Sequence, residues 1–240
     1  KVQTIHAFCE KLLQRFPLEA GVAPGFRILD EELSSEIRRA AITDTLQQAV
    51  GNPQSAVGLA LAVIAARVQG ERFDLLISSA LTKRSWLTAA AALGDPIDTD
   101  RNEAALHSAY CEVFGARADV DTKSLELEMM NVLRVEDMRA FAATLAQGGK
   151  TDAALSDRLN EAASATTDTV RLAALREVFL TKDGTPRSDQ RFISKKLRNS
   201  DIGMTDRMIS ARERFHALTQ EALAVSLAEA SVALAVFADR

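Results

Sequence analysis

Apolar residues near the start of the chain recur at the spacing of one helix face. They stand at i, i+3, i+4, i+7, i+8 and i+11 within residues 2–16, and they are Ile5, Phe8, Cys9, Leu12, Leu13 and Phe16. This spacing predicts an amphipathic helix whose apolar stripe, including Cys9, is buried. Thr4 is suited to cap the first turn with its hydroxyl. Pro17 ends the helix, because the residue before a proline disfavours helical backbone.

The remaining pattern predicts helices and almost no strand. Asp30 opens a second helix with acidic residues in its first turn, and Gly51 ends it. Asn52 and Pro53 are expected to start the next helix, as a cap and a proline at the first helical position. Helical spacing then recurs within residues 57–68, 71–93, 98–114, 125–133, 138–145, 151–159 and 169–180. Alternation with a period of two is confined to residues 26–29.

The last predicted element is the longest. Apolar residues from Met204 to Val232 recur at alternating spacings of about four and three. About 33 residues at roughly 1.5 Å each give a helix on the order of 50 Å long. Such a helix either spans its domain or carries the chain back to a neighbouring one. The predicted fold class is all-α: an irregular multi-helix bundle with a long C-terminal helix and almost no strand.

Composition narrows the class of protein. Of 240 residues, 47% are hydrophobic and 26% are charged, which is ordinary for a globular protein. The net charge of −4 excludes a chain that is polybasic throughout, so a nucleic acid would have to bind a local patch. The two cysteines, Cys9 and Cys111, suit a reducing cytoplasm. No apolar run is expected to reach the length of a membrane span, so no membrane partner is expected.

The first residues have none of the features of a signal peptide. They also lack an initiator methionine. We therefore expect the sequence to be a fragment of a longer protein.

Two short motifs partly match the sequences of nucleotide-binding sites. Residues 148–151 match the end of a phosphate-binding loop, but Thr144 stands where the first glycine belongs and the preceding segment is helical. The end of one helix followed by the cap of the next explains them better. Residues 28–31 resemble a magnesium-binding acidic pair, but Arg27 interrupts the apolar run and a capped helix start suffices. His6, His107 and His216 are too dispersed to indicate a metal site. No catalytic residue, cofactor or metal is therefore expected in this chain.

One segment is strongly basic. Residues 182–198 hold two acidic residues and six basic ones, a local net charge of +4; the basic residues are Lys182, Arg187, Arg191, Lys195, Lys196 and Arg198. Phe192 and Ile193 lie among them and are expected to face inward. Lysine and arginine that neutralise phosphates provide most sequence-independent affinity for DNA. A solvated basic face is the alternative. Residues 83–86, which include Trp86, are a weaker candidate site.

Residues 4–9 (Thr-Ile-His-Ala-Phe-Cys), Leu12 and Leu13, and residues 24–31 (Pro-Gly-Phe-Arg-Ile-Leu-Asp-Glu) resemble superfamily-one DNA helicases of the UvrD/Rep/RecB type. Among these the pattern is most similar to AddA-type helicase–nuclease subunits of double-strand-break repair complexes. In that family a Thr-x-His run closes a strand of the motor core, opens a helix beside the single-stranded DNA track, and precedes a helical insert called subdomain 1B. Residues 179–187 resemble a turn late in the same insert.

The resemblance implies a division of the chain and a set of roles. Residues 1–30 would be the edge of the motor core, and residues 31–240 would be the 1B-type subdomain, as one domain or two sub-bundles. Thr4 and His6 would lie near the single strand, and the basic segment would contact phosphates of the strand or of an incoming duplex end. ATP and Mg²⁺ binding, 3′-to-5′ translocation and exonuclease activity would belong to a bacterial, cytoplasmic parent protein with an AddB-like partner subunit.

A second function class stays open. An acidic, alanine-rich helical chain also suits a non-enzymatic interaction module that holds a partner subunit. An exposed apolar patch without affinity for DNA would favour this alternative. The two functions are compatible, because a subdomain of a heterodimer can contact both partner and DNA.

Overall fold

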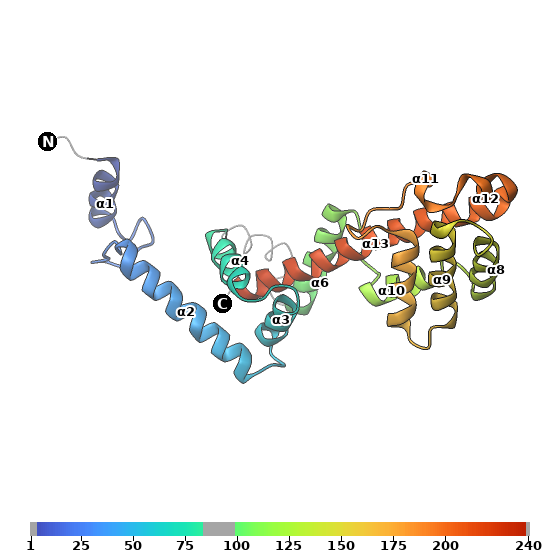
Figure 1. Cartoon of the computed structure of the whole chain (residues 1–240). Helices are drawn as coiled ribbons and strands as arrows, with labels where there is room; N and C mark the ends of the chain where they lie inside the picture. Colours follow the sequence, from blue (N-terminus) through green and yellow to red (C-terminus); the bar gives the residue numbers. More distant parts are fainter. Residues whose placement is uncertain (1–3, 84–98, 239–240) are drawn as a thin grey trace. The chain divides into compact units, whose positions relative to one another are not determined.

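The computed structural model describes residues 4–83 and 99–238 of the chain (Figure 1). The predicted all-α class is confirmed, including the long C-terminal helix. In the described residues, strand-like pairing is limited to an isolated bridge between Leu180 and Pro186. The chain divides into two compact units, Lys1–Pro53 and Gln54–Arg240. This boundary lies after the second helix, whereas the family resemblance places one after residue 30.

The first unit contains α1 (Ile5–Arg15) and α2 (Glu31–Gly51). The Thr4 Oγ1 accepts a hydrogen bond from the Ala7 amide at 3.3 Å, and the Asp30 Oδ1 accepts one from the Leu33 amide at 2.8 Å. Each bond satisfies an amide that the first helical turn leaves without a partner. Both predicted caps, and the end of α2 at Gly51, are confirmed.

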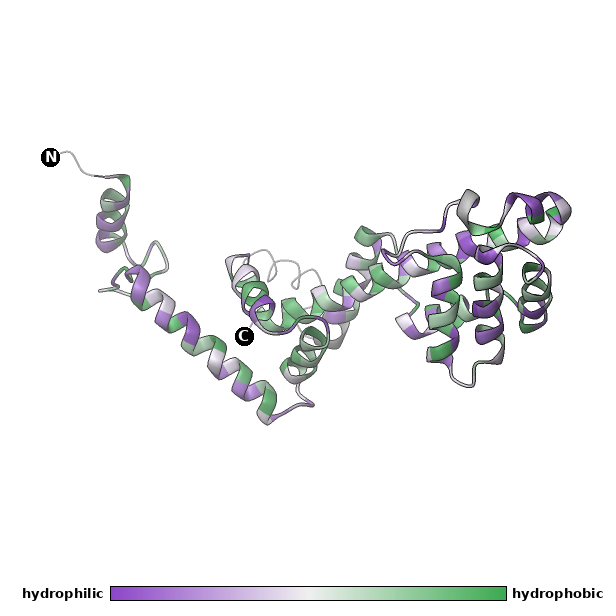
Figure 2. Cartoon of the chain, viewed as in Figure 1, coloured by the Kyte–Doolittle hydropathy of each residue, from purple (hydrophilic) through white to green (hydrophobic). Residues whose placement is uncertain are grey.

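The predicted burial of the α1 stripe was wrong. Cys9 is exposed, and Ile5 and Phe8 are 74% and 53% exposed. Among the described residues of this unit, Ala49 alone is buried. The periodicity identified an apolar face correctly, but no described residue of α1 is buried; Figure 2 shows apolar residues along both helices. The stripe is therefore an unoccupied apolar surface of the unit.

The second unit is built along α13 (Ile202–Ala238). Its C-terminal half packs against α3 (Ala56–Ala65), α4 (Glu71–Thr82) and α6 (Thr99–Phe114). The buried cluster there joins apolar side chains of α6 to small side chains of α13, namely Leu106, Tyr110, Cys111, Ala228, Ala235 and Ala238. Most of the α13 contribution is alanine, so α13 and α6 approach each other closely.

The predicted start of α3 at Asn52 and Pro53 was also wrong. Asn52 is the C-cap of α2, and Ser55 caps α3 by accepting a hydrogen bond from the Gly58 amide at 3.1 Å. The first free amides of α3 lie within reach of the Ser55 hydroxyl, so serine takes the capping role. Pro53 lies outside the helix.

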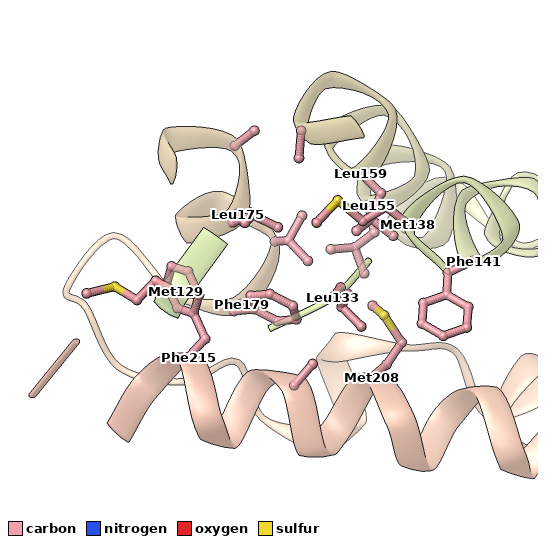
Figure 3. Packing of buried hydrophobic residues seen from close by; sticks show 14 of the residues in the cluster. Met129, Leu133, Met138, Phe141, Leu155, Leu159, Leu175, Phe179, Met208 and Phe215 are labelled. Carbon is pink, nitrogen blue, oxygen red and sulfur yellow. The ribbon is translucent and has the colours of Figure 1, made fainter. Parts of the chain in front are cut away.

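The N-terminal half of α13 carries the larger core. Four helices, α7 (Thr122–Met130), α8 (Val135–Leu145), α9 (Lys150–Ser164) and α10 (Asp168–Phe179), pack with it. Figure 3 shows side chains from these helices, among them Met129, Leu159 and Phe179, converging on α13, which contributes Phe215. The rings of Phe179 and Phe215 lie 5.2 Å apart between centroids. Two short helices, α11 (Asp189–Phe192) and α12 (Lys195–Ser200), complete this part.

By length and composition α13 is sufficient to cross a membrane. The expectation that no apolar stretch is long enough was therefore wrong by this criterion. The same criterion is met by core helices of water-soluble proteins, which are apolar for a different reason. Buried residues recur from Met204 to Ala238, and they pack against α3, α6 and α7. Of its most apolar 18-residue window, 33% is buried, so packing against these helices accounts for part of the apolar character of α13.

Candidate nucleic-acid interface

The basic segment begins in a tight turn after α10. The Arg187 amide donates to the Phe179 carbonyl at 3.0 Å, and the Thr181 amide donates to the Thr185 carbonyl at 2.8 Å. Gly184 has a φ of +76°, a left-handed conformation that glycine adopts without a steric cost. These bonds fix the turn and leave Lys182 exposed beside its tip.

Arg187 closes the turn and is only half-exposed. Its Nε and Nη2 donate to the Glu177 carbonyl, at 3.2 Å and 2.9 Å. This carbonyl belongs to the last turn of α10, where positive charge is favourable because of the helix dipole. Arg187 therefore stabilises the end of a helix as well as adding positive charge to the segment.

The next part of the segment is held by Arg212, which projects from α13. The Arg212 side chain is 7% exposed, and its Nη1 lies 2.6 Å from the Asp189 Oδ1. The same nitrogen donates to the Arg187 carbonyl. The guanidinium also lies 5.3 Å from the centroid of the Phe192 ring. One buried cation thus attaches residues 187–192 to α13.

Asp152 holds the following turn and is fully buried. Its Oδ1 accepts a hydrogen bond from the Ser194 amide at 2.9 Å, and its Oδ2 accepts one from the Gly149 amide at 3.1 Å. The carboxylate therefore joins the start of α9 to the start of α12. A Cβ on Gly148 would collide with the Asp152 side chain, so glycine is required there.

These contacts also settle the interpretation of residues 148–151. Gly149 is the N-cap of α9, and the segment before it is the end of α8. A phosphate-binding loop needs a strand that feeds the turn, and here a helix precedes it. The helix-cap explanation is confirmed, with α9 starting at Lys150 rather than at the predicted Thr151 or Asp152.

The segment ends in α11 and α12, where its charged and apolar residues are separated. Lys195 and Lys196 are exposed, and neither makes an ion pair or hydrogen bond with a described residue. Arg198 is half-buried. Phe192 and Ile193 are each 1% exposed, so their predicted inward orientation is confirmed. The apolar residues anchor the segment and the two lysines face solvent.

The segment runs antiparallel to α13, as the path through α11 and α12 in Figure 1 shows. Lys182 lines a groove together with Gln220 of α13, and the Arg187 carbonyl accepts a hydrogen bond from the Arg212 side chain. α12 contacts α13 where α13 begins. From the first turn of α13 to Gln220, about 16 residues at about 1.5 Å per helical residue give roughly 24 Å. The basic residues distributed along this length are Lys182, Arg187, Lys195, Lys196 and Arg198. The side chain of Arg191 lies outside the described part of the structure.

The other candidates lie elsewhere. Thr4 and His6 belong to the first unit, where the Thr4 hydroxyl caps α1 and His6 is exposed. Lys83 is the C-cap of α4, and residues 84–86 lie outside the described residues. Within residues 4–83 and 99–238, no three His, Cys, Asp or Glu side chains are grouped as metal ligands.

Sequence reasoning missed the two residues that organise the segment, Arg212 and Asp152. A signal for Arg212 was present, because it lies four residues after Met208 and three before Phe215, on the apolar face of α13. A charged residue on such a face is almost never buried without a partner. No comparable signal marks Asp152, whose partner Ser194 lies in a different helix.

In comparisons with known proteins, no family model, curated protein or solved structure matches the chain.

Proposed function

We propose that this chain is a DNA-binding helical subdomain of an ATP-dependent 3′-to-5′ helicase–nuclease of the AddA type, which acts in double-strand-break repair. The observation that carries the DNA-binding part is a set of exposed lysines on residues 182–198 whose side chains have no partner among the described residues, namely Lys182, Lys195 and Lys196. Cations in this state are free to replace the counterions of a phosphate backbone. The parent activity rests on the resemblance of residues 4–31 and of the turn at residues 179–187.

Anchoring of the segment supports the same proposal. Arg212 and Asp152 hold its backbone, so little conformational freedom is lost when phosphates bind. The cations extend over roughly 24 Å of α13. At about 3.4 Å per nucleotide, the spacing of a strand within duplex DNA, this length corresponds to about seven nucleotides. We therefore expect affinity to rise with oligonucleotide length up to about that size.

Residues 1–30 take a different role in the proposal. The apolar face of α1 is exposed, with Leu12 at 48% and Phe16 at 46%. A face of this kind suits contact with a motor core, which is where the resemblance places it. Thr4 and His6 would then lie near the single strand. ATP and Mg²⁺ would bind in the motor core, which lies outside these residues.

The test is fluorescence anisotropy with labelled single-stranded DNA and a tailed duplex, across a series of salt concentrations. The variant Lys195→Glu/Lys196→Glu reverses the two exposed charges of α12. Loss of two phosphate contacts is expected to reduce the slope of log K against log salt by about 1.4 for a single strand. The matched control is Arg38→Glu/Arg39→Glu, which makes the same charge change on an exposed adjacent pair in α2.

Two outcomes would contradict the proposal. A chain that binds neither DNA at low salt has no phosphate track. Equal weakening in the α12 variant and the α2 control would mean that net charge alone governs binding, and the basic segment would lose its assignment.

The interaction-module alternative is favoured by one observation, the uncovered apolar face formed by Ile5, Phe8, Leu12 and Phe16. Contiguous exposed apolar side chains of this kind mark sites of contact with protein partners. Under this alternative, Phe8→Asp abolishes assembly with an AddB-like subunit and leaves DNA binding unchanged. Co-purification of the two subunits with wild type and variant distinguishes the roles.

A further inference from the structure

A groove of about 740 Å³ lies where the basic segment begins. Its walls come from the start of α7, the end of α10, the turn at residues 181–184 and the middle of α13. Lys182, the first cation of the segment, lies on its edge. A strand bound along the segment would therefore pass the mouth of this groove.

One wall of the groove is apolar. Leu180 is 5% exposed and forms part of the floor, and Leu223 of α13 is 55% exposed. An exposed leucine beside a concave surface leaves apolar area in water, where burial under a flat ligand is favourable. The face of a nucleobase has this shape and polarity, and single-strand binders hold bases by such face contacts.

The polar groups of the groove match the edge of a base. The Gln220 amide and the Glu126 carboxylate both line it, and neither is bonded to a described residue. An amide offers a donor and an acceptor, and a carboxylate offers acceptors. The edges of bases present complementary amino, imino and carbonyl groups.

Two further side chains match a phosphate. Arg176 of α10 and Lys182 of the turn both line the groove, and neither has an ion pair with a described residue. The acidic residues Glu177 and Asp183 line the same groove, and the Glu177 carboxylate is paired with Arg158 at 2.8 Å. The groove therefore combines an apolar wall, hydrogen-bonding side chains and two cations. These are the features that recognise one nucleotide.

We infer that this groove holds one unpaired base of the bound strand, with the phosphate of that nucleotide at Arg176 and Lys182. The inference rests on the proposed function, and it adds that the chain selects single strands. A base within a duplex is stacked and paired, so it cannot enter the groove without the cost of extrusion. Phosphate contacts alone would not distinguish single-stranded from duplex DNA as sharply, because both forms present phosphates.

The test compares two labelled single strands of equal length by anisotropy. One is oligothymidine, and the other carries abasic sites at its central positions, so that its phosphates are kept and those bases are missing. Loss of one buried contact is expected to weaken binding of the abasic strand by roughly fivefold. The variant Leu223→Asp is expected to remove this difference, because it places a negative charge on the apolar wall.

Leu227→Asp is the matched control. Leu227 is an exposed leucine one turn farther along α13, at 46%, and it does not line the groove. It is expected to keep the wild-type preference for the base-bearing strand. Free thymidine monophosphate is included as a competitor and is expected to compete weakly, because most of the affinity comes from the other phosphates of the strand.

The outcomes separate this inference from the proposed function. Equal, salt-dependent affinity of the wild type for both strands would overturn the base assignment and leave the phosphate track in place. Full displacement of the strand by stoichiometric thymidine monophosphate would assign the groove to a free nucleotide. This outcome would also overturn the base assignment. Absence of binding to any DNA would instead overturn the proposed function.

Discussion

Arg212 on α13 and Asp189 on α11 form an ion pair in which one partner is buried and the other faces water. The Nη1 to Oδ1 distance is 2.6 Å, while the two side chains are 7% and 56% exposed. The arginine is the fixed partner, because it also donates to the Arg187 carbonyl and lies over the ring of Phe192. The exposed cations of the basic segment are therefore positioned by a cation that does not reach the surface.

Replacing Arg212 with leucine is expected to lower the free energy of unfolding by about 1–3 kcal/mol, because the Arg187 carbonyl loses its donor and Asp189 loses its counterion. Arg212→Lys is expected to recover part of the loss, since lysine restores the positive charge but not the planar guanidinium group with its several donors. Urea denaturation followed by circular dichroism measures both.

The neighbouring Arg214 provides the control. It is 68% exposed, and its Nη2 lies 3.9 Å from the Glu128 carboxylate. Arg214→Leu is expected to change stability by no more than about 0.5 kcal/mol, as is usual for exposed pairs. Equal losses at Arg212 and Arg214 would contradict the anchoring role of Arg212.

Asp152→Ala is expected to be more damaging than a typical surface change. It leaves the Gly149 and Ser194 amides without their acceptor in a buried site, at a cost of about 2–4 kcal/mol in unfolding free energy. Asp157→Ala, at an exposed position of the same helix, is the comparison and is expected to be nearly neutral. Similar values for both variants would show that the Asp152 bridge contributes little.

The caps of α1 and α2 were predictable because capping is local. Thr4 and Asp30 each bond an amide three residues ahead, so the sequence around them contains both partners. Burial is not local in this sense. Phe8 and Phe215 both lie on apolar helical stripes, yet Phe8 is 53% exposed and Phe215 is fully buried. The difference lies in what packs against each helix.

The basic segment shows the same division. Its charge was visible in the sequence, but the engagement of Arg187 with the Glu177 carbonyl depends on the fold of the turn. The groove depends on tertiary structure even more. Arg176, Lys182 and Leu223 come from α10, the following turn and α13, and no spacing pattern joins them.

Lowering the pH is expected to weaken one contact of α13 in particular. The Arg117 guanidinium bonds both oxygens of the Glu221 carboxylate, at 2.7 Å and 3.1 Å, and this holds the pKa of Glu221 below its usual range. The folded state therefore binds the proton less tightly than the unfolded state does. The stabilisation is complete above the usual glutamate pKa and is lost as the pH falls through the lowered value.

Glu221→Gln tests this pH dependence. The variant is expected to be less stable than the wild type at neutral pH, and the difference between them is expected to shrink as the pH falls below the usual glutamate range. Urea denaturation at a series of pH values measures the difference. A difference that stays constant down to the acid transition would show that ionisation of Glu221 does not contribute.

The two phenylalanines provide the last prediction. Phe215 lies in the larger core and contacts the ring of Phe179, so Phe215→Ala is expected to reduce the free energy of unfolding by about 3–5 kcal/mol. Phe8→Ala is expected to have almost no effect on this chain alone, because no core surrounds Phe8. If α1 docks on a motor core or a partner subunit, Phe8→Ala weakens that assembly instead. Thermal unfolding of the isolated chain and of the assembled protein, each with both variants, separates a residue that stabilises the fold from one that stabilises a contact. A large loss from Phe8→Ala in the isolated chain would mean that the stripe of α1 is covered within this chain after all.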